Sequence, residues 1–522
     1  MSTNKSILKS ASIIGLGTLF SRILGFVRDI VLARLFGVYM YAQVFVVAFK
    51  IPNLLRDLVG EGAANAAFVP VFTEYRLKHS EKEFWELANV MLNIMLVILS
   101  GLTILGIIFS PLIVRLIAPG FLADPQKLEL TVRLNRILFP YILLIGLAAY
   151  ATSILNTLKH FSAPAFAPCL LNISIIVFAM LFGESIQGLS LGVLVGGLLQ
   201  LAVQIPVLYK KGFRLNLSGR FKHPAVKAIA QLMAPRIFSS STYQLNNFVD
   251  SMFGSLAFAV GEGGVAVLYF AYRLIQFPLG IFSNALSQAI LPALSAQALE
   301  EKQDNLKDTL YFGLRATFLV MLPASIGFMV LSGPIIEGIF QGGRFDFYSA
   351  QQTSRALLFY SIGLFAYAGS KILQSCFFAL KDTVTPAKVS FLALVVNIVL
   401  NFILMYPMKL SGLALATSIS GINTFFVLFF CLKKKLKVAS GDVKMLLLSF
   451  TRILAASIAM GLTCYYISQN LFISGKGIFY RLANLILPIA SGFISYIVFC
   501  FLFKVKEMQE LWQWLTNRKR TL

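Results

Sequence analysis

Two apolar stretches near the start of the chain contain ionisable residues where a membrane helix normally has none. Residues 21–61 read SRILGFVRDIVLARLFGVYMYAQVFVVAFKIPNLLRDLVGE, and their charged positions are Arg22, Arg28, Asp29, Arg34, Lys50, Arg56, Asp57 and Glu61. A charge near the centre of a bilayer costs at least about 2.5 to 3.5 kcal/mol, so such groups usually face a water-filled cavity, a partner or a substrate. Most charges well inside these apolar runs are cationic. We therefore predict a positively charged cavity, lined by the first two helices, that receives an anion.

A plainer interpretation remains open for part of this set. Arg34 and Lys50 have side chains long enough to reach a membrane interface, and Arg28 and Asp29 can offset each other's charge as a structural pair. The plainer interpretation is favoured for Arg34 and Lys50. The cavity is favoured for Arg22 and Arg56, which lie deep in their segments.

The type of cation indicates the type of anion. Arginine stays charged at any depth, and its planar fork of donors suits phosphate or diphosphate oxygens better than an ammonium does. Ser21, Arg22, Gly25 and Asp29 form a polar stripe, because residues 22 and 29 are seven apart and share a helix face. Guanidinium groups from three separate helices, at Arg22, Arg56 and Arg273, would clamp two linked phosphates. The alternative is a set of intramembrane ion pairs with Asp29, Asp57 and Glu61.

Composition places these residues in a membrane protein. The 522 residues are 58% hydrophobic and only 13% charged, which excludes a soluble globular protein of ordinary composition. Strand-length alternation with regular turn signals is absent, so the spans are helices and not a barrel. The net charge of +23 would suggest nucleic acid for a soluble protein. Here the basic residues lie in short loops between apolar runs, so topology explains them and no nucleic-acid partner is expected.

No residues of catalytic or metal-binding pattern stand out. The five cysteines lie singly in or beside apolar segments, the three histidines fall in expected loops, and Gly-rich nucleotide loops are missing. We therefore expect a protein that is not an enzyme and that has no catalytic residues.

The expected fold is an all-α polytopic membrane protein with fourteen transmembrane helices. At about 20 residues per span, the segments are 10–36, 41–73, 87–117, 131–157, 165–183, 188–209, 228–257, 264–296, 309–340, 352–379, 386–406, 411–432, 446–469 and 480–504. Lysine and arginine concentrate in the connections after even-numbered segments, for example RLKHSEK and KKKLKVASGDVK. Because such loops stay in the cytoplasm, we expect both termini inside the cell.

An internal repeat at an offset near 222 predicts two pseudo-symmetric six-helix lobes. AFKIPNLLRDLVGEGAANAAFVP aligns with AYRLIQFPLGIFSNALSQAILP, so that Lys50 matches Arg273. Both halves enter the membrane in the same sense, with a cavity between them. The expected domains are an N-lobe over 1–215, a C-lobe over 216–437, and residues 438–522 with helices 13 and 14 and a cytoplasmic amphipathic tail.

Two further groups of residues are candidates for special roles. Pro52 with Gly60 and Gly62, and Pro278 in the eighth segment, would break their helices and act as hinges. The oxygen-bearing side chains that could bind Na⁺ are those of Asp250, Asn397, Asn401 and Thr417. Spacing alone is weak support, and hydrogen bonding between helices explains the latter group at least as well.

Several stretches together resemble one family. FSRILGFVRDIVLARLFG at 20–37, then VAFKIPNLLR, GEGAANAAFVPVFTEY, KHFSAPAFAP and FAYRLIQFPLGIF, resemble the MurJ (MviN) family of lipid II flippases in the multidrug/oligosaccharidyl-lipid/polysaccharide exporter superfamily. The resemblance runs essentially end to end, including the two C-terminal helices.

The resemblance implies a cationic cavity between two lobes and alternating access that carries lipid II, the undecaprenyl-diphosphate-linked peptidoglycan precursor, to the outer leaflet of the bacterial inner membrane. The positions that match the family's cavity residues are Ser21, Arg22, Arg28, Asp29, Arg56, Glu61 and Arg273. Asp250, Asn397, Asn401 and Thr417 match a sodium site of the family. Helices 13 and 14 resemble a pair that forms a groove for the polyprenyl tail. Many members have acids where Gln43, Tyr272 and Gln276 stand here.

We predict a lipid II flippase whose partners are lipid II, membrane lipids and the cell-wall synthesis machinery, and which acts as a monomer. No cofactor other than a candidate Na⁺ is expected. A flippase for another polyprenyl-diphosphate-linked oligosaccharide is the first alternative. A membrane enzyme acting on polyprenyl phosphates and a structural scaffold are less favoured.

Overall fold

A computed structural model describes residues 3–55, 64–216, 221, 223–300, 303–437, 440–471 and 478–518. The chain divides into two compact units, one over residues 1–257 and one over residues 258–522. Throughout the described residues the secondary structure is helical except for an isolated bridge between Gly342 and Phe345. The expectation of an all-helical membrane protein is confirmed.

The helices of the first unit are α1 (Thr3–Phe36), α2 (Met40–Leu55), α3 (Ala64–Lys78), α4 (Glu81–Ile117), η2 (Pro119–Ala123), α5 (Pro125–Leu138), α6 (Tyr141–Thr157), α7 (Ser162–Phe182), α8 (Ile186–Ala202), α9 (Ile205–Lys210) and α10 (Pro224–Gly254). Those that follow are α11 (Ala257–Val260), α12 (Gly264–Pro278), η3 (Leu279–Ser283), α13 (Asn284–Leu299), α14 (Gln303–Val330), α15 (Ser332–Ile339), α16 (Phe347–Ile362), α17 (Leu364–Ala379), α18 (Val384–Lys435), α19 (Ser440–Asn470), α20 (Ile478–Leu502) and α21 (Lys506–Arg518).

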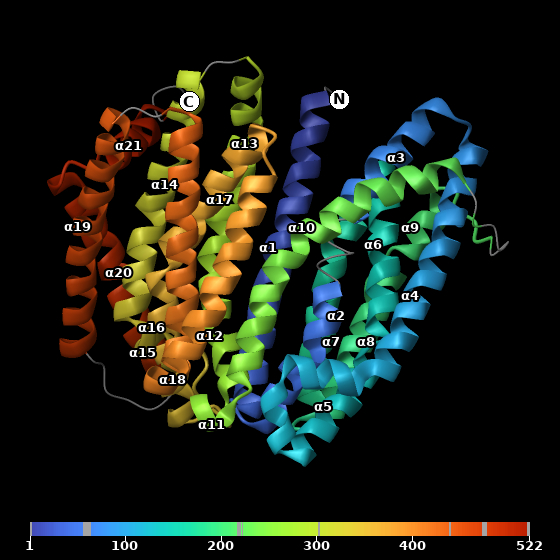
Figure 1. Cartoon of the computed structure of the whole chain (residues 1–522), viewed down its shortest axis with the longest axis horizontal. Coiled ribbons are helices and arrows are strands. Elements are labelled where there is room, and N and C mark those ends of the chain that lie inside the picture. The colour runs from blue at the N-terminus through green and yellow to red at the C-terminus, as the bar shows by residue number, and fades with distance from the viewer. Residues whose placement is uncertain are drawn as a thin grey trace. The chain divides into compact units, whose positions relative to one another are not determined.

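In the first unit, α7 packs against both α1 and α8, and α3 packs against α6 (Figure 1). Small residues permit the close approach of α1 to α7. A Cβ added to Gly17 would lie only 2.5 Å from the carbonyl oxygen of Ala165, so a larger residue at position 17 would push the helices apart. Aromatic rings fill the α3–α6 side, where the rings of Phe68 and Tyr150 are 5.7 Å apart.

The second unit is built around α14, which packs against α13, α17 and α19. The ring of Phe318 on α14 meets those of Phe425 on α18 and Phe450 on α19 edge to face, at 6.0 and 5.1 Å. Tyr496 on α20 donates a hydrogen bond of 2.7 Å to the Leu319 carbonyl. These contacts join α19 and α20, the last two long helices, to the rest of the unit.

Nine of the described helices are long and apolar enough to cross a membrane, or up to ten if α16 and α17, bent by 43°, form one span. α18 would be about 78 Å long as one rod of 52 residues, well over the roughly 30 Å of a hydrocarbon core. Lys409, at φ 54° and ψ −133°, interrupts it two residues after Pro407. The interruption falls between the predicted segments 386–406 and 411–432. The count of fourteen spans stays a prediction.

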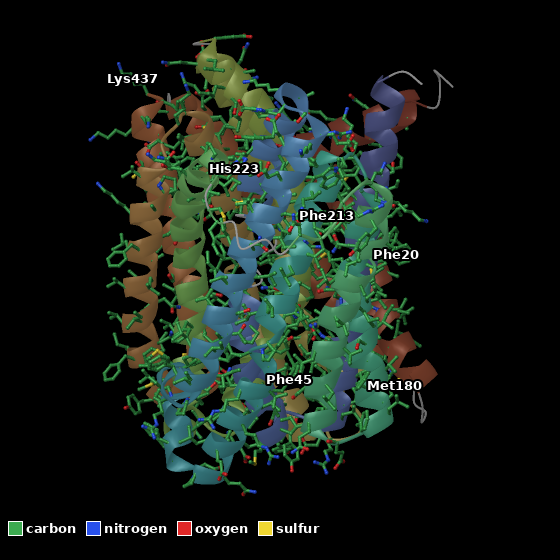
Figure 2. All side chains as sticks on the ribbon, turned by 90° about the vertical axis from the view of Figure 1, so that its right-hand side faces the viewer. Phe20, Phe45, Met180, Phe213, His223 and Lys437 are labelled. Atoms are coloured by element: carbon green, nitrogen blue, oxygen red, sulfur yellow. The ribbon has the colours of Figure 1, made fainter. Side chains whose placement is uncertain are left out.

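Apolar side chains also cover the outside of the first unit. Phe20 on α1 and Met180 on α7 are 51% and 72% exposed and lie at its surface (Figure 2). Many other large apolar residues of α4 and α7 are similarly exposed. Such a surface suits hydrocarbon and not water.

On the second unit, Asp382 precedes α18 and binds its far end. The Lys435 ammonium lies 2.6 Å from the Asp382 carboxylate, which also accepts hydrogen bonds from the backbone and hydroxyl of Thr385. The hydrogen bond from Lys435, followed by the one from the Thr385 backbone, lowers the pKa of Asp382 from 3.8 to about 2.

We expect Asp382→Asn to lower the unfolding free energy near neutral pH by about 0.2 to 1 kcal/mol, because this pair is partly exposed to water. The carboxylate stabilises the fold at pH values above its ordinary pKa, and this contribution is lost as the pH falls toward 2. Melting temperatures in detergent over a pH series measure the effect. Lys435→Ala should reproduce it, and the neighbouring Lys434→Ala should not. Equal melting temperatures of the wild type and Asp382→Asn near neutral pH would contradict the assignment.

Candidate functional site

Arg28 and Asp29 form a buried ion pair on α1. The Nη2 and Nε atoms of Arg28 donate to Oδ1 of Asp29 at 2.8 and 3.1 Å. Both side chains are almost fully buried, at 5% and 1% exposed. A guanidinium and a carboxylate held together in a low dielectric are stable only when their remaining donors and acceptors are also satisfied. In this structure, Arg28 and Asp29 therefore neutralise each other, as the structural-pair interpretation expects.

An amide on α7 completes this arrangement. Nη1 of Arg28 donates to Oδ1 of Asn172 at 3.1 Å. The Nδ2 atom of Asn172 in turn donates to the carbonyl oxygens of Ser21 and Pro168, at 3.1 and 3.3 Å. Asn172 was not anticipated from the sequence, because a single asparagine in an apolar segment 144 residues away carries no signal of its partner.

Arg22 differs from Arg28. Its side chain is exposed, and among the residues that the structure describes it makes no ion pair or hydrogen bond. Ser21, next to it, is partly buried against α7 through its carbonyl. The predicted shared face of Arg22 and Asp29 therefore includes one exposed and one buried residue. Arg28 is thus neutralised within the unit, whereas Arg22 is available to an external group.

Lys50 on α2 meets α10. Its ammonium donates a hydrogen bond to the hydroxyl of Ser251, and the Asp250 carboxylate lies near enough to act on its charge. The structure thus brings Lys50 and Asp250 together in the first unit. Arg56, Asp57, Gly60, Glu61 and Gly62 lie outside the described residues. Pro52, the remaining hinge candidate of this segment, lies inside α2.

Arg273 lies on α12 in the second unit and is half-buried. Its Nη1 donates to Oε1 of Gln276 at 3.3 Å, and its guanidinium lies 5.4 Å from the ring centre of Tyr269. The Tyr272 ring is 5.5 Å from that of Tyr360. Gln276, where relatives were expected to have an acid, is thus a direct neighbour of this arginine. α12 ends at Pro278 and a π-helical turn follows, at the position where a hinge was predicted.

The sodium candidates fall in both units. Asn397 donates to the Thr417 hydroxyl at 3.2 Å, and Asn401 donates to Oδ1 of Asn397 at 3.0 Å. Asn401 is fully buried, and its Oδ1 has no hydrogen-bond partner among the described residues. Asp250 belongs to the first unit. No group of three or more His, Cys, Asp or Glu residues that could hold a metal occurs in the described part of the chain.

Two other polar positions stand out, of which Lys371 was not predicted from the sequence and Gln43 was noted there. Lys371 on α17 is partly buried, and its ammonium lies 2.5 Å from Oδ1 of Asn284. Gln43 on α2 is 2% exposed, and its Nε2 has no hydrogen-bond partner within the described residues. A charge inside an apolar run is costly and so marks a residue with a special role. Lys371 could have been predicted in this way, as Arg22 and Arg28 were.

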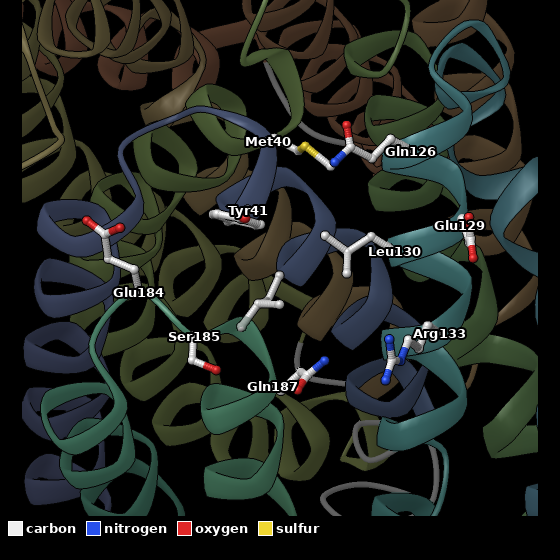
Figure 3. Close-up of a pocket in the computed structure, with 10 residues that line it drawn as sticks. Met40, Tyr41, Gln126, Glu129, Leu130, Arg133, Glu184, Ser185 and Gln187 are labelled. Carbon is white, nitrogen blue, oxygen red and sulfur yellow. The ribbon is translucent and has the colours of Figure 1, made fainter.

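A pocket of about 460 Å³ lies where α2, α5 and α8 begin (Figure 3). Tyr41, Leu130 and Ile186 contribute apolar and aromatic surface, while Arg133 and Gln187 point toward each other across it. The pocket belongs to the first unit alone. Its polar residues are exposed, so water competes with any ligand there.

The comparisons with known proteins decide the family. The family model described as lipid II flippase MurJ matches residues 32–482, most of the chain. This chain belongs to the lipid II flippase MurJ family. The resemblance stated from the sequence is confirmed, and the chain is a transporter and not an enzyme.

Individual relatives agree with the MurJ family assignment. A probable lipid II flippase MurJ of Buchnera aphidicola subsp. Acyrthosiphon pisum is 39% identical over 81% of this chain and 83% of its own length. The lipid II flippase MurJ of Burkholderia cenocepacia is 34% identical over 80% and 82%. The chain is accordingly a multi-pass membrane protein of a bacterial family.

Solved structures agree on the MurJ fold. A lipid II flippase MurJ in an inward closed conformation matches with a TM-score of 0.78 at 29% identity, covering 94% of this chain and 98% of that one. An inward-facing multidrug resistance MATE family transporter of the MOP superfamily matches with a TM-score of 0.68 at 15% identity, covering 80% and 94%. The second match shows a shared fold and nothing more.

We predict that Asp29→Asn destabilises the protein by about 3 to 5 kcal/mol, because it leaves the Arg28 guanidinium buried without its countercharge. Arg22→Gln, on the same helix but exposed, should change stability by no more than about 0.5 kcal/mol. Thermal unfolding of both variants in one detergent measures the difference. Equal stability of the two variants would contradict the buried pair.

Proposed function

We propose that the chain carries lipid II from the inner to the outer leaflet of the bacterial cytoplasmic membrane by alternating access. In this mechanism the diphosphate binds the guanidinium groups of Arg22, Arg56 and Arg273. The protein makes and breaks no bond. It lowers the cost of moving an anion through a low-dielectric layer by replacing the water that the diphosphate loses.

The observation that carries this proposal is the contrast between two arginines of α1. Arg28 is neutralised by Asp29 and capped by Asn172, whereas Arg22 is exposed and makes no polar contact among the described residues. An exposed cation on an apolar helix favours the binding of an anionic ligand. Membership of the lipid II flippase family indicates which anionic ligand this is, since lipid II carries a diphosphate.

Ser21, Arg28, Asp29 and Glu61 complete the proposed binding region, but in two roles. Arg28 and Asp29 support α1 from inside the unit, because their charges already offset each other. Ser21 lies where α1 meets α7, and the neighbouring Arg22 is on the exposed side of the helix. Pro52 in α2 and the π turn after Pro278 are the proposed points of bending.

The finer architecture proposed with this function has fourteen spans in two six-helix lobes, with both termini in the cytoplasm. Helices α19 and α20 pack against each other and present apolar side chains such as Leu462 and Phe493 outward. They are the proposed groove for the polyprenyl tail. α21 has exposed Trp512 beside charged residues, which suits the cytoplasmic surface of the membrane. We propose that the protein acts as a monomer among membrane lipids and cell-wall synthesis proteins.

A sodium ion is the proposed source of direction, together with the membrane potential. The support lies in the cluster of Asn397, Asn401 and Thr417, where Oδ1 of Asn401 is buried without a hydrogen-bond partner in the described residues. An orphaned amide oxygen costs free energy that a small cation can recover. Asp250, on the first unit and close to Lys50, is the proposed acidic contributor.

We expect Arg56→Gln and Arg273→Gln to reduce the initial rate of lipid II transport about tenfold or more. Each removes a charge-assisted hydrogen bond, which is typically worth about 1.5 to 3 kcal/mol. Fluorescently labelled lipid II in liposomes, with and without a sodium gradient and a membrane potential, reports the rate. Arg355→Gln, an exposed arginine of α16, serves as the matched control and should transport normally. Wild-type rates in the Arg56 and Arg273 variants would refute the clamp.

For sodium, Asn401→Ala should abolish the stimulation of transport by an inward sodium gradient while the sodium-independent rate changes less than about twofold. The variant removes the orphaned oxygen and leaves the remainder of α18 in place. Asn305→Ala, an exposed amide of α14, is the control. An unchanged response of Asn401→Ala to sodium would exclude this cluster as the coupling site.

A further inference from the structure

The amide of Asn172 lies between two helices that a transporter of this kind must hold in register. Asn172 is in the interior of α7, four residues after Pro168, and only 6% exposed. Oδ1 faces the Arg28 guanidinium, and Nδ2 faces the carbonyls of Ser21 and Pro168. Only this orientation of the amide satisfies one donor and two acceptors at once. The geometry therefore fixes the side chain without ambiguity.

The face of α1 that meets α7 runs along Gly17, Ser21, Gly25 and Arg28. These positions are spaced by four, four and three residues and so share one side of the helix. Gly17 leaves room for α7, because a Cβ there would collide with a carbonyl of α7, whereas one on Gly25 would make an ordinary contact of 3.7 Å with the Asn172 amide. Asn172 reaches across this interface with hydrogen bonds to both Ser21 and Arg28, and Cys169 of α7 also donates to the Gly17 carbonyl at 3.9 Å.

Two consequences follow from where these bonds end. Ser21 and Arg28 are about two helical turns apart along α1, and the Arg28 side chain reaches back so that one amide bonds both its guanidinium and the Ser21 carbonyl. One side chain therefore fixes both the height and the rotation of α1 against α7. The rotation of α1 determines which way Arg22, next to Ser21, presents its guanidinium. Loss of the amide would leave Nη1 of Arg28 without this acceptor in a buried place, and α1 would have to turn or shift to solvate it.

We propose that Asn172 is a positioning residue for lipid II transport: through Ser21 and Arg28 it holds α1 in the rotation that presents Arg22 to the substrate. It touches neither the diphosphate nor an ion. This inference rests on the proposed role of Arg22, but the helix registration that it describes can be measured without any substrate.

The first experiment measures registration in the full chain. Spin labels are attached to cysteines introduced at Ile23 of α1 and Val177 of α7, both exposed, and report the distance between the helices. The chain without the two introduced cysteines, treated with the same label, gives the background signal. We expect one narrow distance distribution for the wild type and a broadened or shifted one for Asn172→Leu. The matched control is Ser174→Ala, which removes a buried hydrogen bond from the same helix to Gly192 of α8. It should keep the wild-type distribution.

The second experiment measures transport of lipid II into liposomes as a function of its concentration. Asn172→Leu should lower the maximal rate per folded molecule about tenfold, the effect of losing one hydrogen bond to a charged group. The half-saturating concentration should change less than about twofold, because the residue does not contact the substrate. Asn172→Gln keeps both an oxygen acceptor for Arg28 and an N–H donor for the Ser21 carbonyl, and should restore the rate to within about threefold of the wild type.

The outcomes distinguish the positioning role of Asn172 from the proposed transport of lipid II. A wild-type distance distribution in Asn172→Leu, or an equal loss of transport in Asn172→Leu and Ser174→Ala, overturns the positioning role. If the wild type itself does not transport lipid II while Asn172→Leu still broadens the distribution, the proposed function fails and the registration of α1 stands. Should Asn172→Leu not fold, Asn172→Ala is measured in the same way and decides by the same criteria.

Discussion

The structure depends on one constraint: a charge in the hydrocarbon layer needs either a countercharge in the protein or a bound ligand that supplies one. Arg28 meets it internally through Asp29, at 2.8 Å, with Asn172 accepting a further hydrogen bond. Lys50 meets it through contacts on α10. Arg22 remains open on the same helix as Arg28. In a family that transports a diphosphate-bearing lipid, such an exposed cation is suited to binding the diphosphate.

The same constraint explains how polar side chains behave elsewhere in the helices. Hydroxyl groups turn back to the carbonyl four residues earlier, as Thr103 does to Leu99, Ser153 to Ala149 and Thr317 to Gly313. In hydrocarbon no water is available to take these protons. Asn172 also bonds the carbonyl four residues earlier, but it reaches Ser21 and Arg28 of α1 as well and so marks a place where two helices meet. Asn401 bonds a side chain and marks a place where a ligand could complete the set.

Much of the fold was predictable from the sequence, and the reason is physical. Hydrophobic length and the distribution of lysine and arginine act locally, so helix positions follow from them, including the interruption of α18 near Pro407. Pairing between distant segments does not follow. The contact of Arg28 with Asn172 joins residues 144 apart, and nothing in either segment names the other. Arg28 and Asp29 were included with the substrate-binding residues, although their adjacency already favoured a pair. Lys371 was not predicted, although it too is a cation inside an apolar run.

The direct test of the central claim is the affinity of the purified protein for lipids that share one polyprenyl tail and differ only in the head. Equilibrium binding is measured for a diphosphate, a monophosphate and an alcohol of the same chain length at constant ionic strength. The account predicts that affinity falls by at least about tenfold at each step, because each step removes a charged partner from the guanidinium groups. Equal affinity for the alcohol and the diphosphate would show that the tail alone is recognised and would contradict the account.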